Sequence, residues 1–288
     1  MGDDEGESVT GSGETNAWKR FWERGGWWRA LILVVGYFVL YQGAALALGP
    51  IAPSIDDAES AGYVLFFFVL PIAIGGVILV LFGLSVGWLR ELFGPQPIRG
   101  RGWMWIAVAV VLVFNILRFA TIDYAELDFG YVAAWLLAGL CIGFAEEVLT
   151  RGYVVNLMRK AGHPEIAVAL VSAALFAALH ASNLLLGQSL FATLLQLLYT
   201  FAFGICMYLT LRVTGNLIWP ILLHASTDPS IFLQGPHHVD SPLATIAGFG
   251  NIPVILVGLL AIIFIRGRVT TDTDAASAVG GTTPAYDR

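Results

Sequence analysis

The chain has 288 residues, of which 57% are hydrophobic and only 12% are charged, and its mean hydropathy is +0.76. A soluble domain of this length does not normally reach such values, so the composition excludes that class and indicates an integral membrane protein. The net charge is −6, and the few basic residues lie at the edges of apolar stretches, where lipid phosphates account for them. No nucleic-acid partner is therefore expected.

Eight apolar stretches are long enough to cross a bilayer as helices, which requires roughly 20 residues each. They lie at about 30–49, 62–87, 103–120, 130–150, 165–184, 189–211, 216–234 and 249–265. Helices are expected because every backbone group must be satisfied internally in lipid. We therefore predict an all-α polytopic membrane protein with about eight transmembrane helices. The seventh stretch is the least uniform, because prolines and polar residues interrupt it.

The basic residues predict how the helices cross the membrane. Of the 15 Lys and Arg residues, all but Arg118 fall before the first stretch, after the last, or in loops on one common side. By the positive-inside rule this side is cytoplasmic, so we expect a multi-pass protein of the cell membrane with both termini in the cytoplasm. The polar ends predict disordered tails at residues 1–28 and 267–288, and residues 29–266 are expected to form one membrane domain.

The segment AEEVLTRGYV, residues 145–154, carries three charged side chains, each of which would cost roughly 2.5 to 3.5 kcal/mol near the bilayer centre. Glu147 and Arg151 are four residues apart on one helical face and predict an ion pair. Glu146 is turned by about 100° from Glu147, which leaves it free of Arg151. A free carboxylate in apolar surroundings is a candidate general base for a water molecule. The alternative is that both glutamates join Arg151 in a salt-bridge network that locks helices together.

Polar side chains also interrupt two later stretches, at His180, Asn183, His224 and Asp228. Two histidines together with the carboxylate of Glu146 favour one of two sites. One is a zinc site of the His₂Glu type, and the other is a set of donors for hydrogen bonds to a reaction intermediate. Hydrogen bonds between helices are the purely structural alternative. The remaining histidines lie in loops and are interpreted as solvated: His163, His237 and His238.

Three short motifs resemble those of a known family, in the same order along the chain. EEVLTR (Glu146, Glu147, Arg151), FAALH (Phe176 to His180) and HASTD (His224 to Asp228) resemble the motifs EExxxR, FxxxH and HxxxN/D. These motifs belong to the CPBP family of intramembrane proteases, which includes the type II CAAX prenyl endopeptidases and the bacteriocin self-immunity proteins. The resemblance covers about residues 130–235, which form the motif core of the membrane domain.

The resemblance implies an eight-helix fold with a catalytic cavity inside the membrane and an endopeptidase that cuts a peptide bond near the membrane. By position, Glu146 would activate the attacking water with help from His180. His224 and Asp228 would stabilise the oxyanion. The supporting residues would be Glu147, Arg151 and Asn183.

The last motif position departs from the better-studied CAAX endopeptidases, which resemble the Asn version, whereas this chain has Asp228. Asn can donate a hydrogen bond to an oxyanion, and ionised Asp cannot. Asp228 would therefore need to be protonated, to orient His224, or to ligate a metal. The resemblance implies a glutamate- or metal-dependent protease, and zinc held by Glu146, His180 and His224 is the candidate cofactor.

Two other functions stay open at this level. A proton-coupled transporter would use the intramembrane Glu, His and Asp as a relay, but transporters commonly show matching halves, and here the polar residues are confined to the second half. A non-catalytic immunity or adaptor protein of the same fold would act by binding. The partners expected for the protease are membrane lipids and a hydrophobic or lipidated peptide. No stretch shows a Gly-x-x-x-Gly face as its dominant feature, so no oligomeric state is predicted.

Overall fold

The computed structural model describes residues 16–270, and in this range the chain folds into helices without any β-strand. The α-helices are α1 (Ala17–Glu23), α2 (Trp27–Leu48), α3 (Ala61–Val64), α4 (Leu70–Val86), α5 (Leu89–Leu92), α6 (Trp105–Ala120), α7 (Phe129–Glu147), α8 (Val155–Lys160), α9 (Glu165–Leu179), α10 (Leu190–Thr214), α11 (Ile218–Gln234), α12 (Pro242–Gly248) and α13 (Asn251–Ala261). The 3₁₀ turns are η1 (Gly49–Ile51), η3 (Gly102–Met104), η4 (Tyr124–Glu126), η6 (His180–Leu184) and η7 (Ile262–Phe264). Two segments are π-helical, η2 (Leu65–Val69) and η5 (Val148–Val154). The predicted all-α fold is confirmed.

Seven helical segments in the described range are long and apolar enough to cross a membrane. They are Trp27–Ile51, Ala61–Val86, Gly102–Ala120, Phe129–Lys160, Glu165–Leu184, Leu190–Thr214 and Pro242–Phe264. The remaining predicted crossing, 216–234, is also a helix, but α11 has 17 residues and is a little shorter than a full crossing. It packs against α7, α6 and α10, so its polar side chains face other helices.

Two predicted boundaries differ from the observed ones. The fourth stretch was expected to end at residue 150, but α7 continues through η5 and α8 to Lys160. The predicted N-terminal tail, 1–28, includes helix α1, whose first turn is capped by the side chain of Asn16. The rest of that tail, residues 1–15, and residues 271–288 of the predicted C-terminal tail lie outside the described range.

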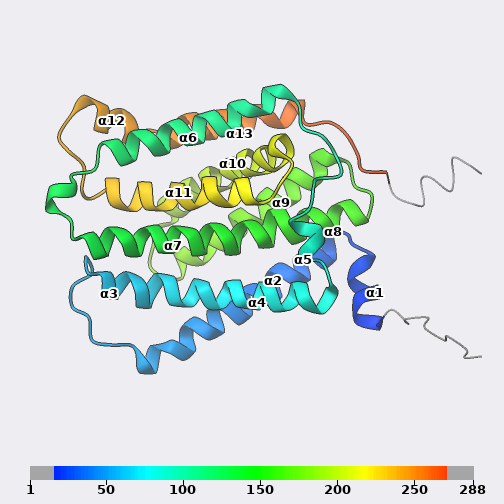
Figure 1. Cartoon of the computed structure of the whole chain (residues 1–288), viewed down its shortest axis with the longest axis horizontal. Helices are drawn as coiled ribbons and strands as arrows, with labels where there is room; N and C mark the ends of the chain where they lie inside the picture. Colours follow the sequence, from blue (N-terminus) through cyan, green and yellow to red (C-terminus); the bar gives the residue numbers. More distant parts are fainter. Residues whose placement is uncertain (1–15, 271–288) are drawn as a thin grey trace, which may run out of the picture.

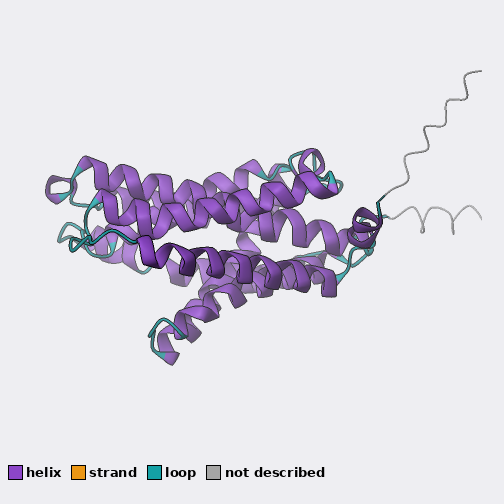
Figure 2. Ribbon diagram, turned by 90° about the horizontal axis from the view of Figure 1, so that it is seen from below, coloured by secondary structure: helices purple, strands orange, loops and turns teal. Residues whose placement is uncertain are grey.

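The long helices lie side by side, with their loops gathered at two ends of the bundle (Figure 1). Both ends of the described chain lie at the same end, together with α1, α5 and α8 (Figure 1). The second half of α2 leans away from the other helices (Figures 1 and 2). Leu46 in α2 is 79% exposed, and Ile51 in the following turn η1 is 70% exposed.

The most extensive helix pair is α7 with α11, and two glycines explain its closeness. A Cβ atom on Gly139 would lie 2.3 Å from the carbonyl oxygen of Ala225, and one on Gly143 would lie 2.7 Å from that of Ile221. Gly139 and Gly143 thus form a Gly-x-x-x-Gly face that lets the two backbones touch. Glu147 comes four residues after Gly143, so it continues this face toward α11.

Candidate active site

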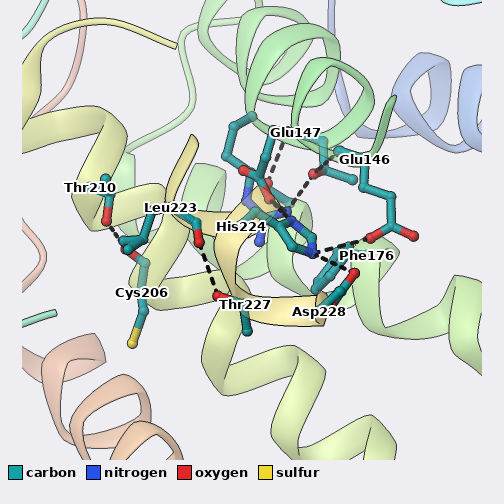
Figure 3. Close-up of polar contacts among 12 residues, drawn as sticks. Glu146, Glu147, Phe176, Cys206, Thr210, Leu223, His224, Thr227 and Asp228 are labelled. Carbon is teal, nitrogen blue, oxygen red and sulfur yellow. Dashed lines mark hydrogen bonds and ion pairs between the residues drawn. The ribbon is translucent and has the colours of Figure 1, made fainter. Parts of the chain in front are cut away.

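His224 is the centre of the site and is 2% exposed on α11. Its Nδ1 lies 2.8 Å from Oε1 of Glu147 on α7, as Figure 3 shows. A carboxylate oxygen only accepts in such a bond, so Nδ1 carries the proton and donates it. The orientation of the imidazole is therefore set by Glu147, and its other nitrogen, Nε2, faces away from this bond.

Two further carboxylates approach Nε2 of His224. Oε2 of Glu146 and Oδ2 of Asp228 each lie 3.6 Å from it, and the three side chains converge in Figure 3. These separations are longer than a direct hydrogen bond. The side chains of Glu146 and Asp228 retain 18% and 23% exposure, respectively, whereas that of Glu147 has none. The two glutamates thus differ as expected, with Glu147 enclosed and Glu146 accessible.

The predicted ion pair between Glu147 and Arg151 is confirmed, with Nη1 of Arg151 at 3.1 Å from Oε1 of Glu147 and both side chains fully buried. Arg151 also donates to Oγ1 of Thr150 and lies over the ring of Phe176, 4.5 Å from its centre. The pair lies where α7 passes into η5, and π-helical turns are frequently found at functional sites. The spacing of residues along this one helix did not predict that Glu147 also accepts a hydrogen bond from His224.

Phe176 connects the three motifs through its ring and its backbone. The ring contacts Arg151, stands edge-on to His180 at 5.1 Å, and stands edge-on to His224 at 5.8 Å. Its carbonyl oxygen lies 3.1 Å from Nδ1 of His180 and can only accept, so His180 donates from Nδ1 and keeps Nε2 free. Phe203 on α10 also packs against His224, with 4.9 Å between the two ring centres.

A cavity of about 180 Å³ lies beside this cluster. It is lined by the predicted residues Glu146, His180 and Asn183, and by side chains that the sequence did not point to: Tyr37, Phe38, Tyr41, Gln42, Ile72, Leu179, Ser182 and Leu186. The hydroxyl of Tyr37 is buried there without a hydrogen-bond partner among the described residues. Asn183 donates from Nδ2 to Gln196 on α10, which positions its amide at the edge of the cavity. The lining residues of α2 belong to none of the three motifs, so the sequence provided no reason to place them at the site.

The side chains predicted to hold zinc are Glu146, His180 and His224. Within residues 16–270 no group of three or more His, Cys, Asp or Glu side chains is arranged closely enough to hold a metal ion. A metal requirement stays a prediction, to be tested by metal analysis of the purified protein.

A second buried charge cluster lies at the end of the bundle near the described termini. Glu165 is fully buried and accepts hydrogen bonds from Arg159 at 2.7 and 2.8 Å, from Arg212 at 2.8 Å, and from Tyr208. The sequence interpretation assigned the basic residues to membrane edges beside lipid phosphates, but these two arginines are neutralised inside the protein. Glu165 lay outside the three motifs and was missed.

The fold and the site define a polytopic all-helical membrane protein whose three motifs meet around one buried histidine. Residues 128–229 match the family described as type II CAAX prenyl endopeptidase Rce1-like. This stretch, about a third of the chain, contains all three motifs, and the resemblance to the CPBP proteases is confirmed. A search among curated proteins gave no significant match.

Proposed function

We propose that this protein is an intramembrane endopeptidase in which Glu146 activates a water molecule to hydrolyse a peptide bond. The observation that carries the proposal is the cavity lined by Glu146 and His180, with His224 held behind it by Glu147. A carboxylate that is accessible from a small cavity within a membrane bundle is suited to accept a proton from water. The Rce1-like match over residues 128–229 supports the same class of activity.

In the proposed reaction, water donates a proton to Glu146 while its oxygen bonds to the carbonyl carbon of the substrate. Nε2 of His180 is a second acceptor that orients this water, because Nδ1 is occupied with Phe176. The carbonyl electrons move to oxygen, and Nε2–H of His224 donates to the resulting oxyanion. The proton on Glu146 then passes to the leaving nitrogen as the C–N bond breaks.

His224 can act as that donor only when both of its ring nitrogens carry protons. Glu147 holds the proton on Nδ1, and the carboxylates of Glu146 and Asp228 at 3.6 Å favour a second proton on Nε2. Of the three roles open to Asp228, we therefore propose that it orients and charges His224. This role does not require Asp228 itself to donate.

The proposed substrate is a prenylated or otherwise hydrophobic peptide. The name of the matched family supports a prenylated C-terminal tail. An apolar groove of about 370 Å³ between α4 and α7 shares Ile72 with the cavity and would accommodate a hydrocarbon chain. We also propose that the protein lies in the cell membrane with both termini in the cytoplasm, which reporter fusions to the C-terminus would test.

The test is cleavage of quenched peptides, lipidated and unlipidated, by purified wild type, Glu146→Gln and Glu126→Gln, with zinc measured on the same samples. Glu126 is an exposed loop residue, so its variant controls for the loss of one carboxylate. We expect wild type and Glu126→Gln to cleave and Glu146→Gln to be inactive although folded. Retained cleavage in Glu146→Gln would rule out the proposed base. Stoichiometric zinc would assign the water activation to a metal instead.

A further inference from the structure

Arg118 is a buried cation without an acidic partner. It lies in the last turn of α6 and is 3% exposed, and no carboxylate in residues 16–270 pairs with it. Its side chain donates from Nη2 to the neutral Oδ1 of Asn251 at 2.8 Å. The other described arginines that are 6% exposed or less each have a carboxylate partner: Arg151, Arg159 and Arg212. A buried charge that lacks a counterion is costly, so an anion would stabilise this site.

A pocket of about 420 Å³ lies at Arg118. Its lining includes His238, Thr245 and Asn251 but no Asp or Glu. Asn251 also lines the pocket, and its Oδ1 accepts the hydrogen bond from Arg118. The pocket therefore offers a guanidinium and an amide to a ligand, and no negative charge that would repel an anion.

The surroundings of the pocket indicate where such an anion would come from. The pocket lies beside α12, at the end of the bundle opposite the described termini (Figure 1). Leu243, Ile246, Phe249 and Ile252 are 45 to 62% exposed on α12 and the start of α13. Apolar side chains around a pocket that contains a guanidinium are suited to the interface of a membrane, where lipid phosphates are the abundant anions.

We propose that this pocket binds a phosphate group, carried by an anionic membrane lipid or free in solution, with Arg118 as its principal ligand. The negative end of α6 compensates Arg118 in part, since the residue lies in the last turn. That compensation comes from partial charges, and a bound phosphate adds a full charge and a bidentate acceptor for the guanidinium. The site is separate from the cavity beside Glu146 and does not depend on the proposed proteolysis.

The experiment measures lipid retention by native mass spectrometry of the full chain in detergent micelles. The probes are phosphatidylglycerol, the phosphate-free diacylglycerol with the same acyl chains, and inorganic phosphate as a competitor. The variants are Arg118→Gln, Gly248→Leu and Arg90→Gln. Gly248 lines the pocket, and a Cβ there would meet nothing within 4 Å, so a leucine side chain should be accepted without a clash, should narrow the pocket and should leave Arg118 in place. Arg90 is exposed on α5, a helix at the opposite end of the bundle (Figure 1), and its variant controls for the loss of one positive charge.

We expect wild type and Arg90→Gln to retain phosphatidylglycerol equally and to prefer it to diacylglycerol. Arg118→Gln and Gly248→Leu should bind it about tenfold or more weakly, as expected for a lost charge-assisted contact. Competition by millimolar inorganic phosphate would identify free phosphate as a ligand, and its failure would identify the lipid headgroup. Equal retention by all four proteins, or equal retention of diacylglycerol, would overturn the proposal. If Arg118→Gln does not fold, the retention of phosphatidylglycerol by Gly248→Leu tests the proposal by itself.

Discussion

The carboxylate of Glu147 joins two motifs by accepting a hydrogen bond from Nδ1 of His224 at 2.8 Å on the same oxygen that pairs with Arg151 at 3.1 Å. This oxygen orients the histidine of α11 and neutralises the arginine of η5 at once. The second oxygen of Glu147 is buried without a partner among the described residues. The properties of the site therefore depend on this one side chain more than its sequence pattern indicated.

Replacing Glu147 should separate its two roles. In Glu147→Ala both Arg151 and His224 lose their partner, and we expect a loss of about 3 to 5 kcal/mol in the free energy of unfolding. Glu147→Gln keeps the shape and an acceptor oxygen, so it should fold better, yet cleavage should fall roughly 10²-fold or more because the histidine loses its anionic partner. Chemical denaturation in detergent and peptide cleavage measure the two effects. Normal cleavage by folded Glu147→Gln would show that catalysis does not depend on the pairing of His224 with an anionic Glu147.

Asp228 should tolerate an amide better than an apolar side chain. Asp228→Asn can place an amide donor at the position of Oδ2, which lies 3.6 Å from Nε2 of His224, and this donor can stabilise an oxyanion directly. The amide lacks the negative charge that favours the second proton on His224, so we expect Asp228→Asn to lose about tenfold in cleavage rate, whereas Asp228→Leu should lose about 10² to 10³-fold. Both rates are measured on the same peptide. Full activity of Asp228→Asn would show that the site does not require the negative charge of Asp228.

Gly204 on α10 should be essential for the position of Arg151. A Cβ at Gly204 would lie 2.9 Å from Nη2 of Arg151 and 3.1 Å from the backbone of Ala173. Gly204→Ala should therefore lower the free energy of unfolding by about 1 to 3 kcal/mol. The matched control is Gly43→Ala in α2, where a Cβ meets nothing within 4 Å and stability should not fall. Equal stability of the two variants would contradict the close packing around Arg151.

The buried ion pairs of Glu165 should contribute more to stability than an exposed ion pair at the same end of the helix bundle. Glu165→Ala leaves Arg159 and Arg212 buried without a counterion, with an expected loss of about 3 to 5 kcal/mol. Glu91→Ala removes a carboxylate that pairs with Lys160 at the surface, and about 0 to 1 kcal/mol is expected. Denaturation midpoints of both variants test the difference. Similar losses in the two variants would show that the buried cluster is not a special source of stability.

Glu23 should make the protein slightly less stable in acid. Burial tends to raise the pKa of Glu23, but hydrogen bonds from Lys160 and Trp88 and the charge of Lys160 outweigh it, so the pKa lies below its ordinary value. A depressed carboxyl pKa stabilises the fold above the pKa of the unfolded chain, about 4.3, and this contribution is lost as pH falls through the folded pKa. Because the side chain is about half exposed, the effect should be about 0.5 kcal/mol or less.

The measurement for Glu23 is the thermal midpoint of wild type and Glu23→Gln between pH 3 and pH 7. The difference between the two proteins should be largest near neutral pH and shrink below about pH 4.5. A difference that grows on acidification would have the opposite sign to that expected from a lowered pKa.

Local patterns in the sequence determined the helices and one of the contacts. Apolar stretches of bilayer length predicted the fold class, because in lipid a helix must satisfy its backbone within its own segment. The spacing of Glu147 and Arg151 predicted their ion pair, since residues four apart share a helical face. The order of three motifs was sufficient to indicate the family that residues 128–229 match.

Only the tertiary structure decided which side chains from different helices meet. Gly139 and Gly143 bring α11 against α7, and this approach, rather than any spacing within one helix, brings His224 to Glu147. Helix packing also decides that Tyr37 lies beside the cavity and that Arg118 is buried without a carboxylate partner. Helical periodicity gives the direction of a side chain from its own axis, whereas contacts between helices depend on how closely two backbones pack, which is a property of the whole bundle.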